Sequence, residues 1–150
     1  MTNKNENSVC FKVAFLIISY ILNSYRRTFE WTGGIVHGIN SVLESEEQDI
    51  EIYIEDMDSK RFSSKAYIRE LQHIYTLKFS GLKFDVVISS DDNAFHFLLR
   101  NHNDLFANTP VVFCGVNYFE DFMLKGHKLF TGVVEATDIK SNIKLNYETY

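Results

Sequence analysis

Polar residues that could bind a small ligand follow one of the buried strands expected in this chain. Asp91, Asp92 and Asn93 come directly after the apolar run 84–88. A carboxylate can bind an amine or a hydroxyl, and the free N–H groups at the start of a helix can bind an anion. One such residue can instead cap the helix expected at 94–101, which leaves the others available. These three residues are therefore the first candidates for a binding site.

Five further candidates follow other expected strands. The hydroxyls of Ser24 and Tyr25 could donate to a carboxylate or phosphate, although both residues could also simply turn the chain. Gly115 would let the backbone approach a ligand closely, and the amide of Asn117 could bind it, with an ordinary turn as the alternative. Glu135 could contact a ligand or lie at a hinge between two lobes.

The elements that would position these residues alternate regularly. Continuous apolar runs indicate strands that are buried on both faces, and helical spacing of apolar residues separates them. Alternation of strand and helix predicts an α/β fold with a mostly parallel, five-stranded sheet, three layers and helices on both faces. With flavodoxin-like strand order, the carboxyl ends of the strands would surround a crevice at the topological switch point. The expected strands are 13–22, 49–55, 84–88, 111–114 and 129–135, and the expected helices are 31–45, 65–80, 94–101 and 139–147.

Two segments also predict which of their faces is buried. The segment 49–55 alternates between isoleucines on one side and acids with Tyr53 on the other, which predicts a half-exposed edge strand. Trp31 opens the helix 31–45; it could stack on a ligand, but a tryptophan at such a position more often packs against the core. The residues expected to face the sheet are Trp31, Ile35, Ile39 and Val42.

Composition limits the classes of function. The 150 residues carry a net charge of −5, and 45% of them are hydrophobic, which predicts one domain with a real core and no nucleic-acid surface. Cys10 and Cys114 do not form a disulfide framework, and the five histidines are too dispersed for a metal site. No nucleophile has a nearby base and no nucleotide-binding fingerprint occurs. We therefore expect a non-catalytic protein without a metal or cofactor.

The two ends of the chain differ from its middle. Residues 1–12 are polar and are expected to form a disordered or targeting segment. The run 13–22 fits either the core of an export signal or a central strand, and it is shorter than the roughly 20 residues of a membrane span. The expected ligand-binding region is 13–135, and 136–150 follows it.

Five segments resemble a known family when taken in order. They are ILNSY with the later Trp31 (21–31), YIEDMDSKRF (53–62), FDVVISSDDNAFHFLL (84–99), TPVVFCGVNYF (109–119) and TGVVE with the following DI (131–139). Together they resemble the ABC-transporter substrate-binding-protein-like family of type I periplasmic-binding folds. Members of that family also serve as sensor domains of bacterial histidine kinases and diguanylate cyclases.

The resemblance implies a first lobe that closes with a second one on a small polar molecule. It implies that 136–150 is the crossover and the start of a truncated second lobe. It also implies an extracytoplasmic location and a membrane-anchored signalling module elsewhere in a longer protein. The sequence leaves open whether the chain forms a homodimer.

Two other functions are compatible with the same fold. A receiver-like signalling domain would need an acidic pair at the end of the first strand, a phosphorylatable aspartate and a lysine after the last strand. Asp91 and Asp92 follow the third strand, but the first strand ends in Asn-Ser-Tyr. A small α/β enzyme would need a nucleophile with its base, which the sequence does not supply.

Overall fold

The computed structural model describes residues 16–44 and 49–135. The expectations for 1–12, for 13–15 and for the segment 136–150 with its helix 139–147 lie outside these residues. The described part is an α/β domain whose five strands form one all-parallel sheet of order β2-β1-β3-β4-β5, which confirms the predicted fold class. In chain order the elements are β1 (Ile17–Asn23), α1 (Glu30–Leu43), β2 (Ile50–Asp56), α2 (Lys65–Lys78), β3 (Val86–Ser90), α3 (Asp91–Leu105), β4 (Val111–Val116), the short 3₁₀ helix η1 (Asp121–Leu124) and β5 (Phe130–Val134).

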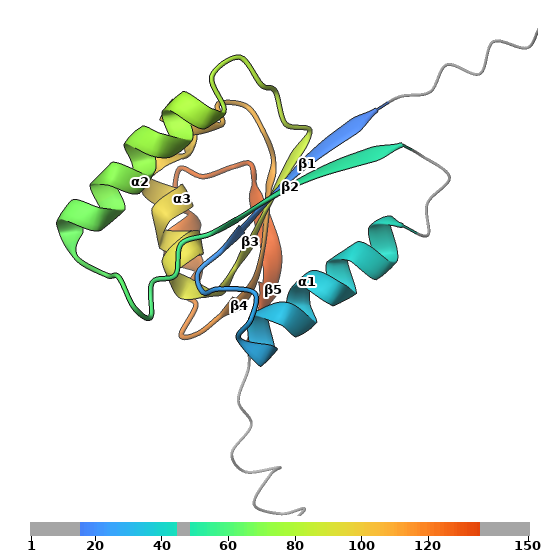
Figure 1. The fold of residues 1–150 in the computed structure, drawn as a ribbon. Coiled ribbons are helices and arrows are strands. Elements are labelled where there is room, and N and C mark those ends of the chain that lie inside the picture. Colours follow the sequence, from blue (N-terminus) through green and yellow to red (C-terminus); the bar gives the residue numbers. More distant parts are fainter. Residues whose placement is uncertain (1–15, 45–48, 136–150) are drawn as a thin grey trace, which may run out of the picture.

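Helices lie on both faces of the sheet. Figure 1 shows α1 on one side and α2 with α3 on the other. Crossovers between parallel strands are right-handed, and the chain moves from β1 to β2 in one direction and through β3, β4 and β5 in the other. The direction therefore reverses between β1 and β3, and this reversal is the switch point where open α/β sheets bind ligands.

The strand β1 is central, which explains its continuous apolar run. It pairs in parallel with β2 on one side and β3 on the other, and its residues from Ser19 to Asn23 are buried. The strand β2 lies at the sheet edge, as the alternation in 49–55 predicts. The expectation for Tyr53 is wrong, however, because its ring packs 5.5 Å from Phe84 and 6.4 Å from Phe79. Both faces of this edge strand are thus partly covered.

An aromatic core fills the space between the sheet and the α2–α3 layer. Tyr20 of β1 lies at its centre, with ring centroids 4.9 Å from Phe79, 5.2 Å from Phe84 and 5.1 Å from Phe106. Large rings bury much apolar surface for few rotatable bonds, so such a cluster holds the sheet firmly against the two helices. This rigid layer supports the strand ends that carry the candidate site.

The predicted buried face of α1 is wrong by one position. The buried residues of α1 are Thr32 and Val36, while Trp31 is 45% exposed and Val42 is 61% exposed. Neighbouring residues on a helix are separated by about 100°, so a small rotation exchanges one stripe for the next. The rotation leaves the Trp31 side chain at the carboxyl edge of the sheet, where it contacts a candidate residue.

Two features of the strands differ from simple expectation or restrict the sequence: the boundary between β3 and α3, and a glycine in β5. The strand β3 continues through Ser90 and α3 begins at once at Asp91, where a polar turn before a shorter helix was expected. Gly132 of β5 lies against Phe113 of β4, and a Cβ at this glycine would come 2.1 Å from the Phe113 carbonyl oxygen. Only a glycine therefore allows this close strand pair at the far side of the sheet.

Candidate functional site

The candidate residues meet at the carboxyl edge of the sheet. Ser24 follows β1, Asp91 and Asp92 follow β3, and Asn117 follows β4. The hydroxyl of Ser24 bonds to the backbone on either side of Asp91, and Asn117 bonds to Asp92. These hydrogen bonds link the ends of three strands at this edge, while a pocket shared by Ser24, Asp91 and Asn117 stays a prediction.

Asp91 has the most unusual environment of the candidates. Its side chain is buried, with 4% of the residue exposed, and its Oδ1 atom accepts a hydrogen bond of 2.9 Å from Nε1 of Trp31. Its other carboxyl oxygen, Oδ2, is buried without a hydrogen-bond partner among the described residues. Burial raises the pKa of this carboxyl, and the Trp31 hydrogen bond opposes the rise. An acceptor at this position is thus ready for a donor that the described chain does not provide.

The backbone at Asp91 is strained because the strand passes directly into the helix. Its φ angle is +65°, a conformation that costs about 1 kcal/mol or more for a residue with a side chain. Aspartate tolerates this region better than most residues do. Strain of this kind persists only where the surrounding structure imposes it, and it occurs often at binding sites.

Gly115 provides the space that the Asp91 carboxyl occupies. Its φ angle is +67°, and a Cβ at this position would lie 3.3 Å from Asp91 Oδ1. A larger residue would therefore push the carboxyl away from Trp31. The sequence predicts that the backbone at Gly115 approaches a ligand closely. In the structure it approaches the Asp91 carboxyl.

Asp92 and Asn117 join the start of α3 to the end of β4. The backbone N–H of Asn117 donates to Asp92 Oδ1 at 2.9 Å, and its amide nitrogen donates to Asp92 Oδ2 at 3.0 Å. Both oxygens of this carboxylate therefore have a partner, in contrast to those of Asp91. The pair holds the loop after β4 in place and leaves the carbonyl of the Asn117 amide for other contacts.

Ser24 caps a helix that belongs to a different part of the chain. Its hydroxyl donates to the carbonyl oxygen of Ser90 at 2.7 Å and accepts from the N–H of Ala94 at 2.8 Å. Ser24 is fully buried, so its single donor is committed to the protein. The structure thus places Ser24 as the residue that positions the start of α3 beneath Asp91.

An aromatic and cationic rim lies beside Asp91. The ammonium of Lys60 lies 3.5 Å from the ring centroid of Phe29 and 4.5 Å from that of Tyr25. Burial raises the pKa of the Tyr25 hydroxyl, and the negative charges of Asp91 and Asp92 raise it further. Glu135 is exposed just after β5, and its charge adds to the rise in the pKa of Asp91. The rim therefore combines both signs of charge with two ring faces.

Asn93 belongs to a different surface from the other candidates. Its amide donates to the hydroxyl of Ser59 at 2.9 Å, and the side chain lines a groove between α2 and α3. One helical step of about 100° separates it from Asp92, which is enough to turn it away from the Asp91 carboxyl. The three consecutive candidates thus point to three environments.

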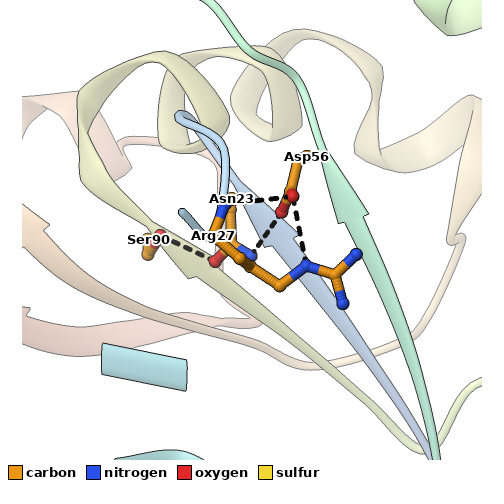
Figure 2. Close-up of polar contacts among 4 residues, drawn as sticks. All are labelled: Asn23, Arg27, Asp56 and Ser90. Atoms are coloured by element: carbon orange, nitrogen blue, oxygen red, sulfur yellow. Dashed lines mark hydrogen bonds and ion pairs between the residues drawn. The ribbon is translucent and has the colours of Figure 1, made fainter. Parts of the chain in front are cut away.

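Sequence reasoning missed a polar network at the ends of β1 and β2. Figure 2 shows Asn23 between Ser90 and Asp56, with Arg27 beside Asn23 and also bonded to the Asp56 carboxylate. The Asn23 amide donates to Asp56 at 2.9 Å and accepts from the Ser90 hydroxyl at 3.0 Å, while Arg27 bonds to the other Asp56 oxygen through its backbone and its guanidinium. A signal was present, because Asn23 and Asp56 are polar residues at the ends of neighbouring apolar strands.

The sequence also does not predict the contacts that Trp31 and Lys60 make at this site. Packing against the core was the favoured interpretation of Trp31, but its ring is half-exposed and its N–H binds Asp91. Lys60 belongs to a charged loop that the sequence does not place, and only the fold brings it over the rings of the β1–α1 loop.

Within residues 16–44 and 49–135, no group of three histidine, cysteine or acidic side chains could hold a metal ion. Cys114 is a half-buried thiol, and burial raises its pKa. No helix in these two ranges combines the length and apolar character needed to cross a membrane.

Comparisons of this chain with protein-family models, with curated proteins and with solved structures found no match. The class of the domain therefore follows from its fold alone. It is an α/β domain with a five-stranded parallel sheet and a polar, partly strained carboxyl edge.

Proposed function

We propose that this domain binds a small polar molecule at the carboxyl edge of its sheet, as one lobe of a sensor or solute-binding protein without catalytic activity. The supporting observation is the buried Asp91 carboxyl, in which one oxygen accepts from Trp31 and the other has no partner within residues 16–44 and 49–135. A buried acceptor without a donor costs about 1–3 kcal/mol. A ligand that brings an N–H or O–H group to Oδ2 would recover this free energy on binding.

The surroundings of Asp91 suit such a ligand. Trp31 covers the carboxyl from the first turn of α1, and its ring is exposed enough to move aside or to stack on the ligand. Lys60 and the amide carbonyl of Asn117 lie near the same edge and could bind polar groups of opposite character. Strand order 2-1-3-4-5 places this edge at the switch point of the sheet.

The mechanism we propose is closure of two bodies on the ligand. A ligand that contacts both this edge and a second lobe gains contacts only in the closed state, so binding shifts the population towards closure. This part of the proposal rests on the resemblance to the ABC-transporter substrate-binding-protein-like family, including its sensor domains. The proposed signalling module and the proposed extracytoplasmic location rest on the same resemblance.

The test is a titration followed by NMR, because one lobe alone should bind weakly. Pools of small metabolites at millimolar concentration are added to the ¹⁵N-labelled chain, and amide shifts are mapped. We expect shifts at the Trp31 indole and at residues 90–94 and 115–117, and loss of binding in Asp91→Asn. Hits whose binding survives both Asp91→Asn and Asp92→Asn, or whose shifts lie elsewhere, would contradict the proposal.

The receiver-like alternative has a direct test of its own. Its chemistry requires acids after β1 and a lysine after β5, whereas Asn23 and Ser24 end β1 and Glu135 follows β5. Incubation with acetyl phosphate and Mg²⁺ followed by intact-mass measurement decides between the two. A gain of one phosphoryl group at Asp91 or Asp92 would favour the receiver over the binding lobe.

A further inference from the structure

A second polar surface lies away from the strand edge, between α2 and α3. The groove has a volume of about 570 Å³, within the range of small-molecule sites. It begins at Asn93, whose amide holds Ser59 of the loop before α2, and it extends along both helices to Arg100. Figure 1 shows α2 and α3 side by side on the face of the sheet opposite to α1. The groove is thus separate from the Trp31 side of Asp91.

Long polar side chains from both helices converge on this groove. On α2 they recur three to four residues apart, so they form one stripe of that helix. On α3 two of them follow the first by seven and eight residues, which again corresponds to one face. The residues are Lys65, Arg69 and Gln72 of α2, and Asn93, Arg100 and Asn101 of α3.

The charge of the groove is opposite to that of the chain. Among the residues that the structure describes, three cations and no carboxylate line it, although the whole chain carries a net charge of −5. Neither Lys65 nor Arg100 forms an ion pair with any residue in the described ranges. Arg69 has only a 3.9 Å contact with the adjacent Glu70, and both of these side chains are mostly exposed. Such an exposed contact contributes little, so the positive charges remain available.

Three cations elsewhere in the described residues are paired with a carboxylate. Arg27 binds Asp56, Arg61 binds Asp58, and Lys78 binds Glu55. The same chain therefore places a carboxylate next to a cation at these positions but none in the groove between α2 and α3. Bringing like charges together is unfavourable unless an anion lies between them.

We propose that the groove between α2 and α3 binds a multiply charged anion of the phosphate class. The guanidinium groups of Arg69 and Arg100 match phosphate oxygens in geometry, and the ammonium of Lys65 adds a third positive charge. The amides of Gln72, Asn93 and Asn101 can hydrogen-bond hydroxyl or carbonyl groups of the rest of the ligand. The phosphate group could belong to a free oligophosphate or to a nucleotide, because both carry the same anionic chemistry.

The experiment compares two anions and two variants. Inorganic tripolyphosphate and a nucleoside triphosphate are titrated into the full chain by calorimetry, with the ionic strength held constant. Lys65→Gln and Arg100→Gln should each weaken binding by about tenfold, the effect of one charge-assisted contact. Lys125→Gln is the matched control, because it removes the same charge as Lys65→Gln from an exposed residue outside the groove.

The outcomes separate this proposal from the site at Asp91. Loss of binding in the two groove variants, with Lys125→Gln unchanged, supports it; tighter binding of the nucleotide than of tripolyphosphate would identify a nucleotide as the source. If Lys125→Gln weakens anion binding as much as the groove variants do, the effect depends only on net charge and the proposal is overturned. The absence of binding to either anion would overturn it as well. Asp91→Asn should leave these titrations unchanged, since the groove lies on the other side of α3. The melting temperature of each variant shows that it is folded.

Discussion

The carboxyl edge of the sheet has two halves that differ in how completely their polar atoms are paired. At the ends of β2 and β1, both Asp56 oxygens and both polar atoms of the Asn23 amide have partners, and Ser90 completes the network (Figure 2). At the ends of β3 and β4, Asp91 has a positive φ angle, a raised pKa and one oxygen that no described residue pairs with. The same edge thus holds one satisfied network and one unsatisfied carboxyl.

The difference indicates two roles for similar residue types. A polar network whose carboxylate and amide are fully paired stabilises the fold. A buried acceptor on strained backbone lowers stability, and natural proteins keep such features mainly where function requires them. We therefore propose a structural role for the Asn23–Asp56 half and a binding role for the Asp91 half, and substitutions of Asn23 and of Asp91 should change stability in opposite directions.

The largest effect is expected in the paired half. Asn23→Ala should lower the free energy of unfolding by about 2–3 kcal/mol, because the fully buried amide is lost and both Asp56 and Ser90 lose a partner. Urea unfolding followed by circular dichroism measures this change. Asn117→Ala is the control, since it removes only the exposed side-chain hydrogen bond to Asp92, which should contribute about 0.5–1 kcal/mol. A loss in Asn23→Ala no larger than in this control would remove the distinction between the halves.

A smaller effect is expected at the end of β4, beside Asp91. Gly115→Ala should destabilise the domain by about 1–2 kcal/mol, because an L-residue is strained at φ +67° and its Cβ would crowd Asp91 Oδ1 at 3.3 Å. Gly126→Ala matches the backbone cost, since Gly126 has a φ angle of +91° and its Cβ would meet nothing within 4 Å. The difference between the two variants in thermal unfolding isolates the contact with Asp91. Equal losses would mean that the Asp91 carboxyl is free to shift.

The smallest effect has the opposite sign. Asp91→Asn should stabilise the domain at pH 7 by about 1 kcal/mol, because a neutral amide replaces a buried carboxylate and asparagine is favoured at positive φ. The folded pKa of Asp91 is raised above its ordinary value of 3.8, so the folded state binds the proton more tightly than the unfolded state. The cost of the charge is therefore complete above the folded pKa and disappears as the pH falls towards 3.8.

The advantage of Asp91→Asn over the natural chain should shrink over the same pH range, which urea unfolding at several pH values measures. Asp92→Asn provides the comparison, since it weakens a paired carboxylate and should be neutral or slightly destabilising. If Asp91→Asn destabilises the domain at pH 7, the unpaired oxygen of Asp91 is not a source of instability.

Much of the fold could be predicted because it depends on local periodicity. The apolar runs at Ile88 and Val112 indicate buried strands, and the helical spacing of Phe95 and Leu98 indicates a helix between them in the chain. The placement of polar residues at strand ends follows from the same pattern, since parallel strands end at one edge. The position of the candidate site was therefore predictable, while its internal contacts were not.

The sequence by itself determined the α/β alternation, the edge position of β2 and the gathering of Ser24, Asp91 and Asn117 at one edge, because these depend on the order and period of apolar residues. Only the tertiary structure decided that Ser24 serves α3, that Asn93 faces the groove between α2 and α3, and that Trp31 reaches Asp91. Adjacent residues at a helix start point about 100° apart, so their roles depend on how each helix rotates against the sheet. Packing sets that rotation, and no short-range pattern in the sequence records it.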